Sequence, residues 1–177
     1  MFPERPRESG HRLLNFSGLS RTVQRRKMAV TSMDETIARL ATRTDHRKLG
    51  MWAAECAERV LHHFEDRNPG DDRPRKAIET LRTWVRTGEF RMATIRGASL
   101  SAHAAARAVA GDDAAKSAAR AAGQAVATAH VPAHSQAAAI YAATAVRDAA
   151  DASGAEAAAL RERRWQYLRL LRLQKAP

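Results

Sequence analysis

The chain has 177 residues, a mass of 19.4 kDa, 45% hydrophobic residues and a formal net charge of +11. This length fits one domain, and no apolar run approaches the roughly 20 residues that a membrane-spanning helix needs. The N-terminus lacks the hydrophobic core of a signal peptide and the single Cys56 excludes an internal disulfide, so we expect a cytoplasmic protein in a reducing compartment.

The positive charge is concentrated at the two ends of the chain. Residues 1–30, 31–155 and 156–177 carry net charges of +5, +2 and +4. Basic ends attract polyanions without sequence specificity, which makes nucleic acid an alternative, non-specific partner. Arginine-rich ends are also common as solubilising or poorly ordered segments.

The first segment, residues 1–30, shows no sustained hydrophobic period. It holds two prolines, two glycines and the basic run Arg25, Arg26 and Lys27. This composition predicts a poorly ordered basic N-terminal arm. Because the composition changes near Met28 and Met33, either methionine is a candidate for the true start of the protein.

Two helices are expected next, a short one over residues 34–41 and a longer one after Asp45, which is a plausible N-cap. Apolar residues of the longer helix recur at three- or four-residue steps, at Leu49, Trp52, Cys56, Val60 and Phe64. Because Cys56 belongs to this stripe, we expect a buried, inert thiol.

A turn at residues 68–70 separates that helix from another. Asp71 or Asp72 is its expected cap, and Pro74 stands in its first turn, where a missing amide proton is harmless. Its apolar stripe includes Ile78 and Leu81, and Gly88 is expected to end it.

Alanine dominates the second half of the chain. Between Ala98 and Ala159, 30 of 62 residues are alanine, the best helix former and a small side chain that favours close helix packing. Four helices are expected, over residues 91–110, 113–130, 133–152 and 155–173. We therefore predict an all-α, single-domain, alanine-rich bundle of about six to seven helices, with residues 31–155 as its main body.

Several separated segments resemble one known family. They are Leu49–Ala57, Asp71–Glu79 before Trp84 and Gly88, Ser101–Arg107 and Ala119–His130. Together they resemble the immunity proteins of bacterial polymorphic-toxin systems, specifically the immunity-five-like domain family, over approximately residues 34–146. The resemblance implies an α-helical protein that neutralises a cognate toxin by direct binding, without known catalytic residues. The segments before Thr31 and after Ala155 fall outside the resemblance.

The first candidate site is a charged surface at the start of the helix after Asp71. Its candidate partner-binding residues are Asp72, Arg73, Arg75, Glu79 and Trp84. Guanidinium groups offer planar donors to a carboxylate or phosphate, and Trp84 adds apolar area. The structural alternative is a capped helix start in which Arg75 pairs with Glu79 one turn later.

The second candidate site is a cleft for a small ligand. Its residues are His103, His130, His134 and Tyr141. Metal ligation is not predicted, because Pro132 interrupts the helix between His130 and His134 and no acidic residue lies within four positions of either. The sequence also holds no recognised catalytic or cofactor motif, so we predict a binding protein without cofactor rather than an enzyme.

The last segment, residues 156–177, reads as a basic amphipathic helix. Leu160, Tyr167, Leu168 and Leu171 are expected on one side, with arginines around them. Such a helix either packs on the bundle or mediates association, including homo-oligomer formation or partner binding.

Overall fold

The computed structural model describes residues 16–176 of the chain, with side chains from residue 21 onward. Within this part the chain forms seven helices of 15 residues or more and the single-turn helix α3, and it contains no strand. The helices are α1 (Phe16–Ala41), α2 (His46–Val60), α3 (His62–Glu65), α4 (Arg73–Thr87), α5 (Met92–Ala108), α6 (Asp113–Ala127), α7 (His134–Ala149) and α8 (Ala155–Lys175). The prediction of an all-α bundle is confirmed.

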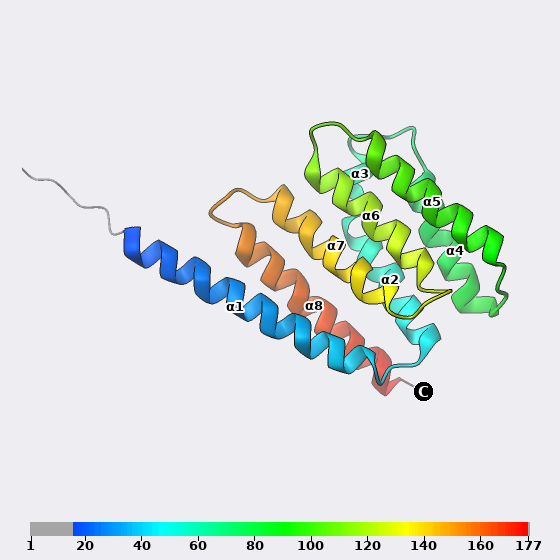
Figure 1. The fold of residues 1–177 in the computed structure, drawn as a ribbon, viewed down its shortest axis with the longest axis horizontal. Coiled ribbons are helices and arrows are strands. Elements are labelled where there is room, and N and C mark those ends of the chain that lie inside the picture. The colour runs from blue at the N-terminus through cyan, green and yellow to red at the C-terminus, as the bar shows by residue number, and fades with distance from the viewer. Residues whose placement is uncertain (1–15, 177) are drawn as a thin grey trace, which may run out of the picture.

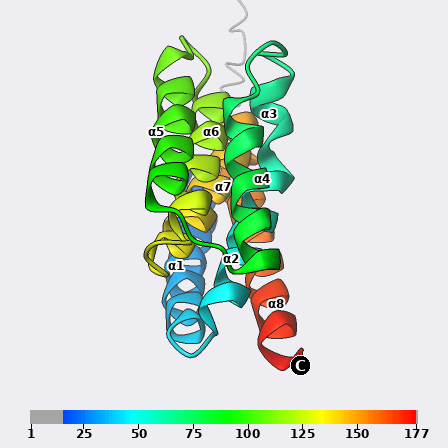
Figure 2. The same cartoon turned by 90° about the vertical axis from the view of Figure 1, so that its right-hand side faces the viewer.

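The helices form two layers, seen edge-on in Figure 2. One layer contains α5, α6, α7 and α1, and the other contains α4, α2 and α8, with α3 at the end of α2 (Figures 1 and 2). The central helices are α2, α6 and α7, which contact one another and helices on both sides. At one edge of the bundle lies α5, packed on α4 and α6, and at the other edge α1 lies against α8.

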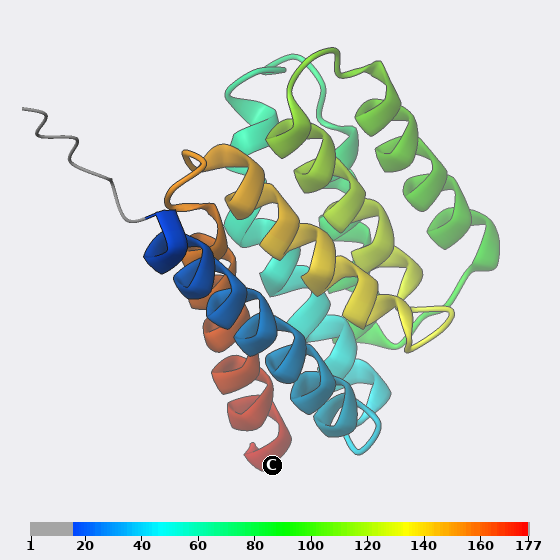
Figure 3. The ribbon, with the colours of Figure 1, turned by 60° about the vertical axis from the view of Figure 1, so that its left-hand side comes forward.

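Helix α1 differs most from the sequence prediction. Instead of a short helix over residues 34–41 after a poorly ordered arm, one helix runs from Phe16 to Ala41, while residues 1–15 lie outside the described part. Its inward positions are Val23, Arg26, Val30, Met33 and Ile37, which follow a three- and four-residue period. The period is not apparent from the sequence because Arg26, in the basic run Arg25–Lys27, occupies one of its inward positions. Figure 3 shows α1 running beside α8 and in the same direction.

Most other helix ends follow the predicted signals. The Asp45 carboxylate accepts hydrogen bonds from the backbone N–H groups of Arg47 and Lys48, and Gly88 ends α4 with φ of +75°. The four helices expected in the alanine-rich half are α5 to α8, with bounds within three residues. The helix expected over residues 45–64 is interrupted at Leu61, which separates α2 from α3.

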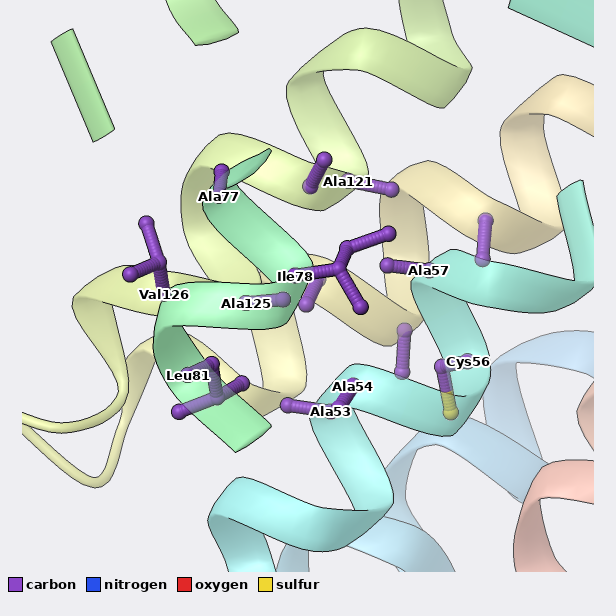
Figure 4. Close-up of a cluster of buried hydrophobic side chains, with 14 of the residues drawn as sticks. Ala53, Ala54, Cys56, Ala57, Ala77, Ile78, Leu81, Ala121, Ala125 and Val126 are labelled. Carbon is purple, nitrogen blue, oxygen red and sulfur yellow. The ribbon is translucent and has the colours of Figure 1, made fainter. Parts of the chain in front are cut away.

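The core draws on every helix and includes the large side chains of Trp52 and Phe64, and many alanines of α2 and α6 pack between them. Figure 4 shows Ile78 and Leu81 of α4 directed toward the alanines of the neighbouring helices. Cys56 is fully buried in this core, and burial raises the pKa of its thiol well above the ordinary value. The prediction of a buried thiol is confirmed.

The buried face of α8 is half polar, and its buried leucines are Leu170 and Leu173 rather than those predicted. Buried residues of this helix include Glu162, Arg163 and Gln166, whereas Leu168 is 42% exposed. Arg59 donates to Glu162, and the Gln166 amide donates to the backbone carbonyl of Ala139. This face of α8 is turned inward because the helix packs on α1, α2 and α7, which supply partners for these polar groups.

Candidate functional site

A cleft of about 360 Å³ lies at the edge of the bundle where α5, α6 and the start of α7 meet. Its lining residues from α5 are Met92, Ile95, Arg96, Ser99, Leu100 and His103, and those from α6, α7 and their connection are Gln124, Ala127, His130 and His134. Three of the four residues predicted for a cleft therefore line one concavity. Its volume falls in the range of small-ligand sites.

One wall of the cleft depends on the close approach of α5 to α6 at Gly123. A Cβ atom at this position would lie 2.9 Å from the Nε2 and Cε1 atoms of His103. The Ser99 hydroxyl also donates to the backbone carbonyl of Gly123, with an Oγ to O distance of 3.0 Å. A side chain at this position would displace the imidazole ring of His103, so the glycine keeps the ring in its observed place.

A second wall is formed by His134, the first residue of α7. Its Nδ1 lies 2.7 Å from Oε1 of Gln124 on α6. An amide oxygen only accepts hydrogen bonds, so Nδ1 carries a proton and Nε2 is the nitrogen that remains for a ligand. The ring of His130 lies 6.3 Å away, centroid to centroid.

The electrostatic character of the cleft is basic, because its lining includes Arg96 and three histidines but no aspartate or glutamate. Burial lowers the pKa of His103, with smaller contributions from Arg107, Arg120 and His134. Burial also lowers the pKa of His134, with a contribution from His130. Both imidazoles are therefore neutral near pH 7 when the cleft is empty.

Tyr141 is the exception among the predicted cleft residues. It is half-buried on α7 and does not line the cleft; the Arg120 guanidinium carbon lies 5.7 Å from the centre of its ring. Its position about two turns farther along α7 separates it from His134.

No metal centre is evident in the described part of the chain. Residues 16–176 contain no group of three His, Cys, Asp or Glu side chains placed to hold an ion.

The predicted charged surface at the start of α4 is largely paired within the protein. The Asp71 carboxylate accepts two hydrogen bonds from the Arg73 side chain, which lowers the pKa of Asp71. Arg75 donates two hydrogen bonds to Glu65 and one to Glu58, so the expected pair with Glu79 is wrong. The tertiary partners on α2 and α3 offer a two-oxygen geometry to Arg75.

The three remaining residues of that surface are Asp72, Trp84 and Glu79. Asp72 is the exposed N-cap of α4 and pairs with Lys76 at 2.8 Å, while its side chain makes no cap hydrogen bond. Trp84 is only 7% exposed, because its ring is covered by α2 at Gly50 and by His46. It contributes core packing rather than exposed apolar area. Glu79 is exposed on the same helix.

Exposed apolar side chains beside the cleft form a feature that sequence reasoning missed. Phe90, Met92 and Leu100 are 45%, 47% and 55% exposed, and the latter two line the cleft. We call these three residues the α5 apolar ridge. The sequence shows that apolar residues of α5 are not confined to one stripe. Only the packing on α4 and α6 shows which of them face outward.

The fold and this site define an all-α helical bundle with a basic, partly apolar cleft at one edge. The family described as Imm-5 like putative immunity protein matches residues 39–173, and the chain belongs to this family. The match includes almost all of α8, so the expectation that the arginine-rich end lies outside the family pattern is wrong. No curated protein and no solved structure matches the chain. Among the described helices, none is long and apolar enough to cross a membrane.

Proposed function

We propose that this protein neutralises a bacterial toxin by binding it directly. The observation that carries the proposal is the family match over residues 39–173, which spans helices α2 to α7 and most of α8. Inhibition by binding requires a rigid surface with a few apolar or arginine anchors rather than reactive groups. The only thiol, Cys56, is buried with a raised pKa, which does not suit a nucleophile.

The α5 apolar ridge is the contact surface that we favour. Its three large side chains lie on and just before an edge helix, and two of them, Met92 and Leu100, line a concavity. Exposed apolar patches next to a groove are typical of sites that bind a partner. By contrast, the α4 arginines already have carboxylate partners, so an incoming toxin would have to compete with Asp71, Glu58 and Glu65.

The test begins with affinity capture from the native host, using low-salt and then high-salt washes, and mass spectrometry to identify a stoichiometric partner. The purified partner is then mixed with this protein, and the complex is measured by calorimetry. In parallel, growth is followed in cells that produce the partner with or without this protein. Direct binding together with restored growth is the expected result. A partner that binds without being toxic, or toxicity that this protein does not relieve, would overturn the proposal.

A matched pair of variants locates the surface. Leu100→Arg places a charge in the α5 apolar ridge and should abolish protection, because the buried contact would hold an unpaired charge. Leu168→Arg is the control, since Leu168 is also exposed but lies on α8 at the other side of the bundle. Equal protection by both variants would exclude the ridge as the contact surface.

A second candidate function is non-specific polyanion binding. It is favoured by the adjacency of α1 and α8, which brings the basic residues of these two helices near one another. Exposed basic residues of these helices include Arg25, Lys27, Arg161, Arg164 and Arg172. This function predicts DNA affinity that falls by orders of magnitude between about 50 and 200 mM salt. Fluorescence anisotropy of labelled DNA tests it by comparing the DNA affinity of Arg25→Glu with that of Thr83→Ala, a surface variant that leaves the charge unchanged.

A further inference from the structure

The basic cleft between α5, α6 and α7 has a chemistry that points to one class of ligand. We propose that it binds a carboxylate carried on an apolar group; resting on the proposed function, the toxin supplies this group as an Asp or Glu side chain beside an apolar residue. The lining offers Arg96 and three imidazoles to a negative charge, and Met92 and Leu100 to an apolar group. No acidic residue among the lining opposes an anion.

The position of His134 gives the carboxylate a defined donor. Its Nδ1 proton is donated to Gln124 Oε1 at 2.7 Å, which holds the ring orientation. When this imidazole takes up a second proton, the proton must go to Nε2, and the ring then presents a charged donor. A hydrogen bond from a charged donor to a carboxylate is stronger than one between neutral groups.

The apolar part of the ligand has its own place in the cleft. Met92 and Leu100 are about half exposed when the cleft is empty, so burial against a ligand would remove apolar area from water. Ile95 lies deeper and is buried already. The glycine at position 123 lets His103 stand close to α6, so the imidazole of His103 lines the cleft without filling it.

A phosphate group fits the same lining less well. Arg96 is the single side chain of the lining with a permanent positive charge, and the pKa values of His103 and His134 are lowered. The start of α7 offers no open anion site either, because the Ser135 and Gln136 amides donate to the carbonyls of Pro132 and Ala133. A monoanion matches this limited charge better than a dianion does.

Binding of the carboxylate should be coupled to protonation of the cleft. Burial is the main cause that disfavours protonation of both histidines; Arg107 on α5, Arg120 on α6 and His134 on α7 add to it at His103, and His130 adds to it at His134. All of them disfavour a second positive charge in the empty cleft. A bound carboxylate reverses this balance, so affinity should rise as the pH falls below about 7.

The probe for the experiment is phenylacetate, with phenylacetamide as its uncharged control of nearly the same shape. Histidine side-chain NMR signals of the full chain are followed during titration at about pH 6 and about pH 7.5. We expect phenylacetate to shift the signals of His103, His130 and His134, to bind more tightly at the lower pH, and to bind about tenfold better than the amide.

Two variants and a control confine the effect to the cleft. Arg96→Gln changes an exposed side chain and His134→Gln keeps a polar group next to Gln124, so both should remain folded. Each should weaken phenylacetate binding by roughly tenfold. His62→Gln, at an exposed histidine on α3, should change nothing. Equal binding of the acid and the amide, or equal binding by wild type and Arg96→Gln, would overturn the inference.

The same variants distinguish this inference from the proposed function. If the protein still relieves toxicity while phenylacetate does not bind, direct immunity stands and the carboxylate site falls. If phenylacetate binds in the cleft but Arg96→Gln forms the toxin complex with unchanged affinity, the ligand class stands and its assignment to a toxin side chain is overturned; the source is then a free carboxylate. Loss of both phenylacetate and toxin binding in Arg96→Gln supports the inference in full.

Discussion

Helices α6 and α8 both contribute buried faces to the bundle, but they do so with opposite chemistry. Seven of the ten buried residues of α6 are alanine, whereas half of those of α8 are the polar residues Glu162, Arg163 and Gln166. Alanine makes no directional contact, so α6 is positioned by how closely its neighbours approach. The polar groups of α8 need specific partners, so α8 is positioned by the hydrogen bonds and ion pairs that it makes. One bundle therefore uses steric fit at its centre and polar pairing at its edge.

The largest expected effect comes from breaking the pairing of α8. Arg163 is 3% exposed, and its Nε lies 2.5 Å from Asp34 Oδ1. Asp34→Ala leaves a buried guanidinium without its carboxylate and should lower the free energy of unfolding by roughly 3 kcal/mol. Urea denaturation measures it, with Glu35→Ala, an exposed neighbour, as control. If both variants lose the same free energy of unfolding, the ion pair does not hold α1 on α8. Replacing Arg163 by Met in the Asp34→Ala background should restore part of the loss.

The next effect tests steric fit on α6. Ala119 is fully buried, so Ala119→Leu should lower the free energy of unfolding by roughly 2 kcal/mol, because the added carbons have no space. Ala149→Leu is the matched control at an exposed position of α7 and should have little effect. Thermal unfolding followed by circular dichroism compares them. A stable Ala119→Leu protein would show that the helices around α6 separate readily.

Two glycine-to-alanine substitutions also test steric fit, and they should change stability in opposite directions. A Cβ at Gly50 would lie 2.7 Å from Cζ3 of Trp84, whereas a Cβ at Gly97 meets nothing within 4 Å. Gly50→Ala should therefore destabilise the protein by about 1 kcal/mol, and Gly97→Ala should stabilise it by about 0.5 kcal/mol through helix propensity. Chemical denaturation of the two variants gives both values. A gain at Gly50 would mean that Trp84 moves aside without cost.

A smaller effect is expected at the paired arginines of α4. Arg75 is 41% exposed, so Arg75→Ala should cost less than about 1 kcal/mol despite its contacts with Glu58 and Glu65. We also expect protection against the toxin to persist. Growth assays with this variant test the α4 surface. If the folded variant no longer protects, the α4 surface is the contact site after all. Trp84→Ala is unsuitable for this purpose, because removing a buried tryptophan side chain destabilises the fold.

The smallest effect is a pH dependence of stability that arises around the cleft. Burial lowers the pKa of His103 and His134 from 6.5, so the unfolded chain takes up protons before the folded chain does. Stability should therefore be retained above pH 6.5 and fall as the pH drops below it. Unfolding curves from neutral to mildly acidic pH measure this slope. His103→Gln should flatten it, whereas an unchanged slope would assign the effect to other groups, including His63, whose pKa burial also lowers.

Local signals in the sequence predicted the positions of most helices and part of the site. Asp45 and Gly88 marked helix ends because their capping geometry involves only neighbouring residues. The shared cleft of His103, His130 and His134 followed from placing them on successive helices. Tyr141 lies outside the cleft because it is seven residues, or about 10 Å, farther along α7 than His134. The partner of Arg75 was missed because Glu65 and Glu58 lie on other helices. The extent of α1 was missed because Arg26 occupies an inward position in its period.

The sequence by itself determined the all-α class, the chain order of the helices and the family, because alanine content, caps and spaced segments are properties of neighbouring residues. Only the tertiary structure decided which face of α8 is buried, that Trp84 belongs to the core, and that α5 exposes an apolar ridge beside a basic cleft. These outcomes depend on contacts between residues far apart in the chain. A buried polar group is stable only where a distant partner satisfies it, and a helical pattern alone does not reveal that partner.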